Sequence, residues 1–373
     1  MALINLMKDT SDFNLVFRTE KQDVSPRITQ VYLEMSTHCN LSCRSCVRNS
    51  IVDFKNSHFS PELMRRVLPM LKKLRLDRIV LLGFGEALCN PDIKHLLKSL
   101  RTLKTKIVLV TNAAFLSEEM SSYLVNLPLD EIYVSWDDDI DGGVNINRKG
   151  IKADLFRMNI EYLLKLKNIS HDERPRIGME MVATKSNYHL IPQAIAYGSS
   201  VGIDKFIVSN IFPYSKEMGK EILYDIGSKP PVNLKKYLSK EIKNSNVVTA
   251  NQSVDITRRC PFIEKGTIFI TATGEVSPCP ELAYTHPAFY FGSDRMHNRF
   301  IVGNMINQSI QSVWDNKQFS EFRKNFVHYD YSDCSFCYQP DRCGMRTDES
   351  VDCFCNTTPC GECLWAKDIV ICP

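Results

Sequence analysis

Three cysteines lie close together near the start of the chain, at positions 39, 43 and 46, in a C-x3-C-x2-C pattern. They directly follow an apolar run over residues 31–35, which predicts a buried strand. Three thiolates can hold a four-iron cluster and leave one iron open, and an open iron can bind and activate a small molecule. The types and spacing of Cys39, Cys43 and Cys46 therefore predict a catalytic iron–sulfur site.

A zinc knuckle is the main alternative for these cysteines. Zinc sites usually pair two C-x2-C units or add histidines at fixed distances, and His38 and His58 do not complete such a pattern. By its spacing and its position after the first strand, the triplet resembles the cluster motif of the radical S-adenosylmethionine (radical SAM) superfamily. The resemblance implies one four-iron cluster with an open site, at which S-adenosylmethionine (SAM) binds.

Length and composition limit the class of protein. A chain of 373 residues, 44% of them hydrophobic, can form one large domain and a smaller one. A net charge of +3, spread along the chain, does not support binding to nucleic acid or to a membrane surface. Because we find neither an export signal nor a membrane span, we expect a cytoplasmic protein, whose 14 cysteines are better explained as metal ligands than as disulfides.

Short apolar runs rich in β-forming residues alternate with longer helical patterns up to about residue 208, which predicts a parallel sheet with crossover helices. The expected strands span residues 31–36, 78–82, 106–111, 131–135, 176–183 and 204–208. The expected helices span residues 61–75, 92–103, 117–126, 153–168 and 190–201. The resemblance implies an α/β fold, a partial (β/α)6 TIM-like barrel, with its chemistry at the carboxyl ends of the strands.

Small and polar residues follow the later strands. The run Gly83-Phe84-Gly85-Glu86-Ala87 looks like the family's Gly-Gly-Glu-Pro motif, with Phe84 and Ala87 as departures. The resemblance implies that Gly85 and Glu86 hold the amino group of SAM. An ordinary loop after a strand is the alternative.

Further cofactor ligands are expected from the third and fourth strands. Asn112 is similar to the asparagine of the family's Thr-Asn-Gly motif, and Ser135 and Asp137 could bind ribose hydroxyls or the carboxylate end of SAM. Arg148 resembles an arginine that pairs with the methionine carboxylate, a role that suits a guanidinium group. The aromatic residue that usually precedes the third motif cysteine is replaced by Ser45, so another residue must hold the adenine.

The C-terminal third carries a second set of cysteines. Its C-x13-G-x4-C and C-x2-C-x5-C spacings resemble the SPASM extension of radical SAM enzymes, which implies two auxiliary four-iron clusters. One expected cluster has the ligands Cys334, Cys337, Cys343 and Cys363, and the other has the ligands Cys260, Cys279, Cys353 and Cys372. Cys355 and Cys360 are substitutes or free thiols, and structural zinc is the alternative.

These patterns divide the chain into four parts. We expect an N-terminal extension over residues 1–28, the radical SAM barrel over 29–230, a helical linker over 231–258 and the SPASM domain over 259–373. A Lys-Pro-Pro run supports the boundary near residue 230.

The resemblance implies an enzyme that cleaves SAM reductively and abstracts a hydrogen from its substrate. Our first hypothesis is an oxidoreductase or maturase that oxidises or cross-links a peptide or protein side chain. The alternatives are modification of a small molecule or a pterin/tungsten-type cofactor, and a non-catalytic electron carrier or zinc-stabilised module. Glu281 is the expected base, with Tyr214 and His286 as weaker candidates, and the expected electron donor is a flavodoxin or ferredoxin.

Overall fold

The computed structural model describes residues 24–52, 54–127, 129–143, 147–170, 173–226, 230–254, 258–290, 292–337 and 351–373. Within these ranges one ten-stranded sheet dominates, in the order β14-β11-β10-β1-β2-β3-β4-β5-β6-β8. Its strands are β1 (Gln30–Leu33), β2 (Arg78–Leu81), β3 (Lys106–Thr111), β4 (Glu131–Ser135), β5 (Arg176–Ala183), β6 (Lys205–Asn210), β8 (Val247–Thr249), β10 (Thr267–Ile270), β11 (Glu275–Ser277) and β14 (Gly303–Asn304). Two small sheets pair β12 (His286–Tyr290) with β13 (Ser293–His297) and β7 (Asp225–Ile226) with β9 (Ser253–Val254).

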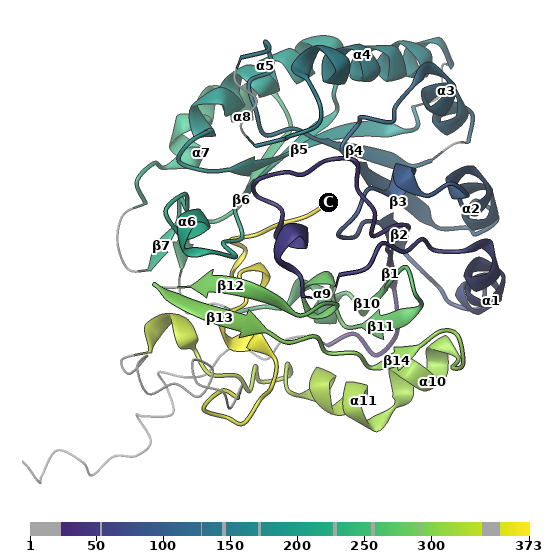
Figure 1. The fold of residues 1–373 in the computed structure, drawn as a ribbon, viewed down its shortest axis with the longest axis vertical. Helices are drawn as coiled ribbons and strands as arrows, with labels where there is room; N and C mark the ends of the chain where they lie inside the picture. Colours follow the sequence, from purple (N-terminus) through teal and green to yellow (C-terminus); the bar gives the residue numbers. More distant parts are fainter. Residues whose placement is uncertain are drawn as a thin grey trace, which may run out of the picture.

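Helices cover the outer face of the curved sheet, as Figure 1 shows for α1 to α5. The α-helices are α1 (Pro61–Leu71), α2 (Ile93–Leu100), α3 (Glu118–Asn126), α4 (Ala153–Ser170), α5 (Ile191–Val201), α6 (Lys216–Gly219), α7 (Leu234–Tyr237), α8 (Ser239–Asn244), α9 (Pro261–Glu264), α10 (Ile310–Asp315) and α11 (Lys317–Lys324). The 3-10 helices are η1 (Val47–Ser50), η2 (Ala87–Cys89), η3 (Tyr188–Leu190), η4 (Pro280–Leu282), η5 (Cys334–Phe336), η8 (Pro359–Glu362) and η9 (Trp365–Lys367). The partial-barrel prediction is thereby confirmed, because the six expected strands and five expected helices are all present.

Local sequence explains why these elements form where they do. The first helix, α1, begins after Ser60, whose hydroxyl accepts a hydrogen bond from the Leu63 backbone N–H at 3.0 Å, and Pro61 suits its first turn. Four apolar residues of α1 at helical spacing are buried against the sheet. The central strands are almost wholly buried, which is typical of parallel strands covered by helices.

The C-terminal part of the chain continues the barrel sheet. Strand β10 pairs in parallel with β1 at the edge opposite β2, and β10 and β11 form a hairpin around Gly274. Buried Glu34, which follows β1, accepts hydrogen bonds from the Phe84 N–H at 2.9 Å, the Ala272 N–H at 3.2 Å and the Tyr284 hydroxyl at 2.5 Å. Glu34 thus ties the loop after β2 to the C-terminal region.

The last described residues run into the middle of the ring of strands (Figure 1). Asn210 donates to the Ile369 carbonyl at 2.9 Å, and the Ile371 N–H donates to the Ser209 hydroxyl at 3.0 Å. Among the described residues, no helix combines the length and apolar character needed to cross a membrane.

Candidate functional site

The loop that carries the cysteine triplet follows β1 and is clamped to a later loop. The Ser42 N–H donates to the Lys149 carbonyl at 3.0 Å, and the Arg44 N–H donates to the Asn147 carbonyl at 2.8 Å. These bonds hold the C-x3-C-x2-C loop over the carboxyl ends of the strands, where a parallel barrel places its chemistry.

The three thiols of this loop lie within each other's electrostatic reach. Burial raises the pKa of Cys43 to about 12; the Arg148 guanidinium opposes this rise, while Asp137 and the thiols of Cys46 and Cys39 add to it. Burial also raises the pKa of Cys39 and of Cys46. A cation favours the thiolate form of such half-buried thiols, so this donor set fits an iron cluster.

The loop after β2 packs directly against the cysteine loop. The Glu86 N–H donates to the His38 carbonyl at 2.8 Å. A Cβ atom at Gly85 would lie 2.3 Å from the Ser36 carbonyl oxygen and 2.6 Å from that of His38. Only glycine allows this approach, so Gly85 is required for the contact between the two loops.

Glu86 and Asn112 join the three loops of the site. One carboxylate oxygen of Glu86 accepts from the Thr111 hydroxyl at 2.8 Å and the Leu88 N–H at 3.0 Å, and the other accepts from the Asn112 N–H at 2.7 Å. The Asn112 side chain donates to Asn40 Oδ1 at 2.9 Å and lies 3.7 Å from Cys39 Sγ. Burial raises the pKa of Glu86, against these hydrogen bonds. The role of Glu86 toward an amino group stays a prediction.

A buried ion pair lies on the far side of the cysteine loop. Arg148 Nε donates to Asp137 Oδ2 at 3.0 Å, and Asp137 Oδ1 accepts from the Val182 N–H at 2.7 Å. The carboxylate of Asp138 accepts from the backbone N–H groups of Asn147 at 2.9 Å and Arg148 at 2.6 Å. Asp137, Asp138 and Arg148 thus hold one another in place after β4, and we call these three residues the Arg148 frame. The positive charge of Arg148 acts on Cys43.

Two acidic residues in or beside this frame were not predicted from the sequence. We predicted a role for Asp137 but none for its neighbour Asp138, whose carboxylate binds the backbone of the loop that carries Arg148. Glu180 on β5 accepts a hydrogen bond from the Ser135 hydroxyl at 2.5 Å, and its charge acts on Arg148. A single acidic residue between two methionines, in the otherwise apolar run over residues 177–183, is the signal that could have revealed Glu180.

Four C-terminal cysteines converge on one apolar cavity, which is lined by Cys260, Cys279, Cys360 and Cys363. Burial raises the pKa of Cys279 strongly, and the charges of the other three thiols raise it further. Aromatic residues, among them Phe322, Phe326 and Tyr329, complete the lining. Four thiols around an apolar cavity fit a fully ligated iron–sulfur cluster.

This grouping differs from the expected partition of the C-terminal cysteines, whose ligand roles stay predictions. Cys360, which we expected to be a substitute or a free thiol, lines the cavity, and so does Cys363, which we expected in the other set. Cys353 is exposed, and Cys372 accepts a hydrogen bond from Trp365 Nε1 at 3.2 Å in a separate cavity. The reason is that the short helix η8 contains Cys360 and has Cys363 as its C-terminal cap, so both cysteines of this C-x2-C unit reach the cavity.

The other expected cluster is only partly described. Cys334 lies beside η8, because a Cβ atom at Gly361 would come within 3.3 Å of its sulfur. Cys337, Cys353 and Cys355 are exposed. Cys343 lies outside the described residues, so its ligand role stays a prediction.

Serine substitutions at Cys360 and Cys372 distinguish the two groupings. We expect Cys360→Ser to lower the iron content of anaerobically reconstituted protein by about four per chain, because the quartet loses one of its four ligands. Cys372→Ser, the matched control, should keep the full iron content. Iron counting alongside a thermal melt measures both, and equal iron loss in the two variants would contradict the quartet.

Two of the expected bases, Tyr214 and Glu281, already form hydrogen bonds within the protein. Tyr214 donates to the Arg44 carbonyl of the cysteine loop, and burial raises its pKa. Burial alone would raise the pKa of Glu281, but the charges and hydrogen bonds of His286 and His297 lower it to about 2. The base role of either residue stays a prediction.

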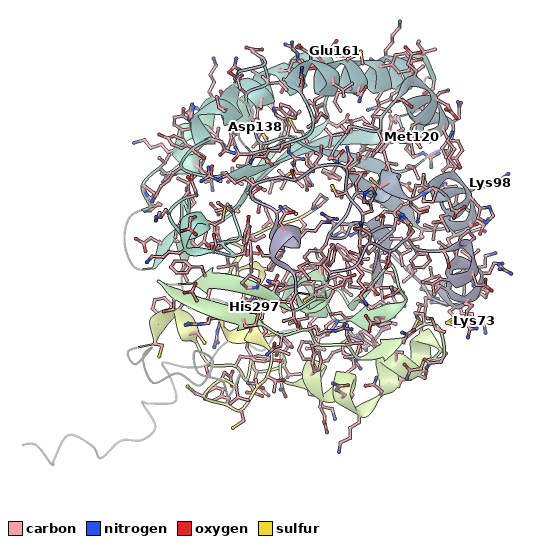
Figure 2. All side chains as sticks on the ribbon, in the orientation of Figure 1. Lys73, Lys98, Met120, Asp138, Glu161 and His297 are labelled. Atoms are coloured by element: carbon pink, nitrogen blue, oxygen red, sulfur yellow. The ribbon has the colours of Figure 1, made fainter. Side chains whose placement is uncertain are left out.

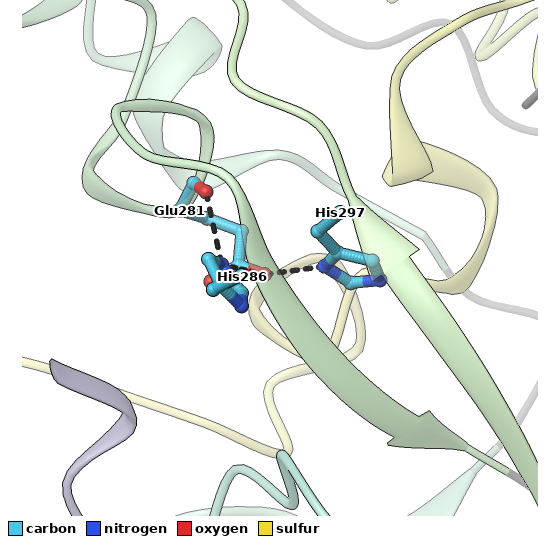
Figure 3. Close-up of side chains that lie close together, drawn as sticks. All are labelled: Glu281, His286 and His297. Carbon is cyan, nitrogen blue, oxygen red and sulfur yellow. Dashed lines mark hydrogen bonds and ion pairs between the residues drawn. The ribbon is translucent and has the colours of Figure 1, made fainter. Parts of the chain in front are cut away.

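Glu281 belongs to a buried cluster with the two histidines, drawn in Figure 3. Its Oε1 lies 2.7 Å from His297 Nδ1 and 3.4 Å from His286 Nε2. Burial would lower the pKa of His297, but Glu281 and Glu362 raise it to about 9. In Figure 2, His297 and Asp138 lie in different halves of the molecule, so this cluster is separate from the Arg148 frame.

Family models match both halves of this arrangement. The model of the radical SAM superfamily matches residues 33–170, and the model of SPASM, an iron–sulfur cluster-binding domain, matches residues 260–338. The chain is a radical SAM protein with a SPASM domain. The cysteine triplet lies in the first match, and two thiols of the cavity quartet, Cys260 and Cys279, lie in the second.

Similar proteins are known over most of this radical SAM–SPASM chain. It is 29% identical over 348 residues to the tungsten-containing aldehyde ferredoxin oxidoreductase cofactor-modifying protein of Pyrococcus furiosus, covering 92% of this chain and 96% of that protein. Its fold resembles SuiB of Streptococcus suis bound to SAM, with a TM-score of 0.60, 19% identity and 80% and 68% of the two chains covered. The fold also resembles anSMEcpe with bound SAM, with a TM-score of 0.57 and 14% identity. The match covers 80% of this chain and 84% of anSMEcpe.

Proposed function

We propose that this radical SAM protein is a maturase that modifies a pterin-type metal cofactor of another enzyme. The observation that carries the reaction class is the half-buried Cys39, Cys43 and Cys46 triplet, held against Asn112 and the Arg148 frame at the strand ends. The substrate class is supported by the near full-length similarity to a protein described as cofactor-modifying.

When bound, the four-iron cluster supplies the electron that cleaves SAM to methionine and a 5′-deoxyadenosyl radical, which takes a hydrogen from the substrate. The chain's own residues bind and orient the cofactor. In this proposal Gly85 and Glu86 hold its amino group, Arg148 its carboxylate, and Ser135 and Asp137 its ribose. Asn112 keeps the loops in register around Cys39.

The SPASM domain would hold auxiliary clusters. We assign one four-iron cluster to Cys260, Cys279, Cys360 and Cys363. A second would take Cys334, Cys337 and Cys343, with a fourth ligand from the exposed Cys353 or Cys355. A flavodoxin or ferredoxin would supply the electron for SAM cleavage, in line with the redox chemistry of such clusters.

An assay of SAM cleavage tests both the proposed reaction class and the proposed substrate class. Anaerobically reconstituted protein with dithionite is expected to form 5′-deoxyadenosine, and more of it when pterin cofactor released from a tungsten oxidoreductase is added. Mass spectrometry should show a changed cofactor. Without any 5′-deoxyadenosine the reaction class fails, whereas cleavage with an unchanged cofactor and a changed peptide would favour the peptide hypothesis instead.

A further inference from the structure

The buried cluster of Glu281, His286 and His297 has the composition of a metal site. Its three ligand atoms lie within 4.8 Å of one another, and all three residues are buried. The register of the β12–β13 hairpin pairs His286 directly with His297, so both rings project from the same face. Glu281 comes from η4, just before the hairpin, and its carboxylate lies against the two rings (Figure 3).

The outer ring nitrogens of both histidines face hydrogen-bond acceptors. His297 Nε2 lies 3.3 Å from Glu362 Oε1, and His286 Nδ1 lies 3.0 Å from the Pro287 carbonyl. Since a carboxylate and a carbonyl only accept, each outer nitrogen has a partner for an N–H, which is the tautomer that a metal-binding histidine needs. With the N–H on the outer nitrogens, the inner nitrogen of each ring directs a lone pair toward the Glu281 carboxylate, so a metal ion can take the place of the protons that otherwise join these groups.

The contacts of the residues behind the two histidines also suit a bound metal ion. Arg295 Nε lies 3.3 Å from Glu362 Oε2, so the carboxylate that orients His297 is itself held by a buried guanidinium. Metal-bound histidines characteristically pass their other N–H to a carboxylate or a backbone carbonyl. The 3.4 Å between His286 Nε2 and Glu281 Oε1 is close to the separation of about 3.3 Å between neighbouring ligands around a tetrahedral zinc ion, and the 2.7 Å between His297 Nδ1 and Glu281 Oε1 is a hydrogen-bond length that has to increase when an ion binds.

We propose that Glu281, His286 and His297 bind one divalent transition-metal ion, as a mononuclear site distinct from the iron–sulfur clusters. Two imidazole nitrogens and one carboxylate oxygen form a ligand set for zinc or ferrous iron with open coordination positions. Glu281 and His297 also line the cavity of the cysteine quartet, so the ion would lie beside an auxiliary cluster. Phe212 packs edge-on against both histidine rings and shields the site from water.

Zinc is the probe that tests this site, because its X-ray absorption edge is separate from that of the cluster iron. Holoprotein with its clusters reconstituted is treated with EDTA, incubated with zinc chloride and desalted. We expect about one zinc ion per chain, with nitrogen and oxygen neighbours at about 2.0–2.1 Å and an imidazole pattern. The absence of retained zinc, or sulfur neighbours at about 2.3 Å, would overturn the proposal.

Variants separate the site from adventitious zinc. His286→Gln should weaken zinc binding by more than about 100-fold, and Glu362→Gln, which weakens the contacts of residue 362 with His297 and Arg295, by about 10- to 100-fold. The exposed His189→Ala variant is the matched control and should bind zinc as the unmodified protein does. Unchanged zinc affinity in His286→Gln would overturn the assignment. Because the wild-type spectrum needs no variant and no SAM turnover, this result stands apart from the test of the proposed function.

Discussion

Replacing Cys39 by alanine is expected to abolish 5′-deoxyadenosine formation and to remove about four irons per chain. The thiol of Cys39 lies beside Asn112 and within the field of Glu86, at the place where the loops after three strands meet. Two remaining thiols do not hold a four-iron cluster firmly, so SAM loses its binding iron. Iron counting and chromatographic detection of 5′-deoxyadenosine measure the two effects.

Cys89 provides the matched control for this substitution. Its sulfur lies 3.9 Å from Asn40 Oδ1, close to the same loop, but it is not part of the triplet. Cys89→Ser should therefore keep its iron and its SAM cleavage. Equal activity of Cys39→Ala and the unmodified protein would refute the assignment of the triplet.

The second large effect is expected from Arg148→Met. The variant leaves the Asp137 carboxylate buried without its partner, and breaking a buried ion pair from one side costs about 3–5 kcal/mol of stability. SAM affinity should fall as well, because the proposed partner of its carboxylate is lost. Thermal melts measure the first effect and titration calorimetry with SAM the second.

A double variant separates stability from binding. Arg148→Met combined with Asp137→Asn removes both charges, and replacing a whole buried pair is often nearly neutral for stability. We expect the melting temperature to recover while SAM binding stays weak. Arg157→Met, which breaks solvent-exposed ion pairs with Asp154 and Asp141, is the control and should leave the melting temperature almost unchanged. Restored SAM affinity in the double variant would exclude the carboxylate role of Arg148.

Much of the barrel could be predicted because its signals are local. The alternation of apolar strands and amphipathic helices appears in every unit, and Ser60 and Pro61 mark the start of α1 in the sequence itself. The meeting of the cysteine triplet, Glu86 and Asn112 followed from one rule, that parallel strands end at the same edge. Their hydrogen bonds to one another did not follow, because they depend on side-chain positions between separate loops.

The grouping of the C-terminal cysteines could not be predicted from the sequence. Spacing alone allows many groupings of its cysteines, and nothing local distinguishes Cys360 from Cys353. The helix η8 makes that choice by turning Cys360 and Cys363 toward Cys260 and Cys279. His297 carried no signal of its own, because only the register of β12 and β13 places it opposite His286.

The sequence by itself determined the chemistry of the first site and the class of fold, because each depends on residue types at short, fixed spacings. The tertiary structure alone decided which distant residues share a cavity, which acids and bases are paired, and how the C-terminal sheet joins β1. These depend on contacts between segments separated by tens to hundreds of residues, such as Glu34 with Tyr284 and Glu281 with Glu362 through His297.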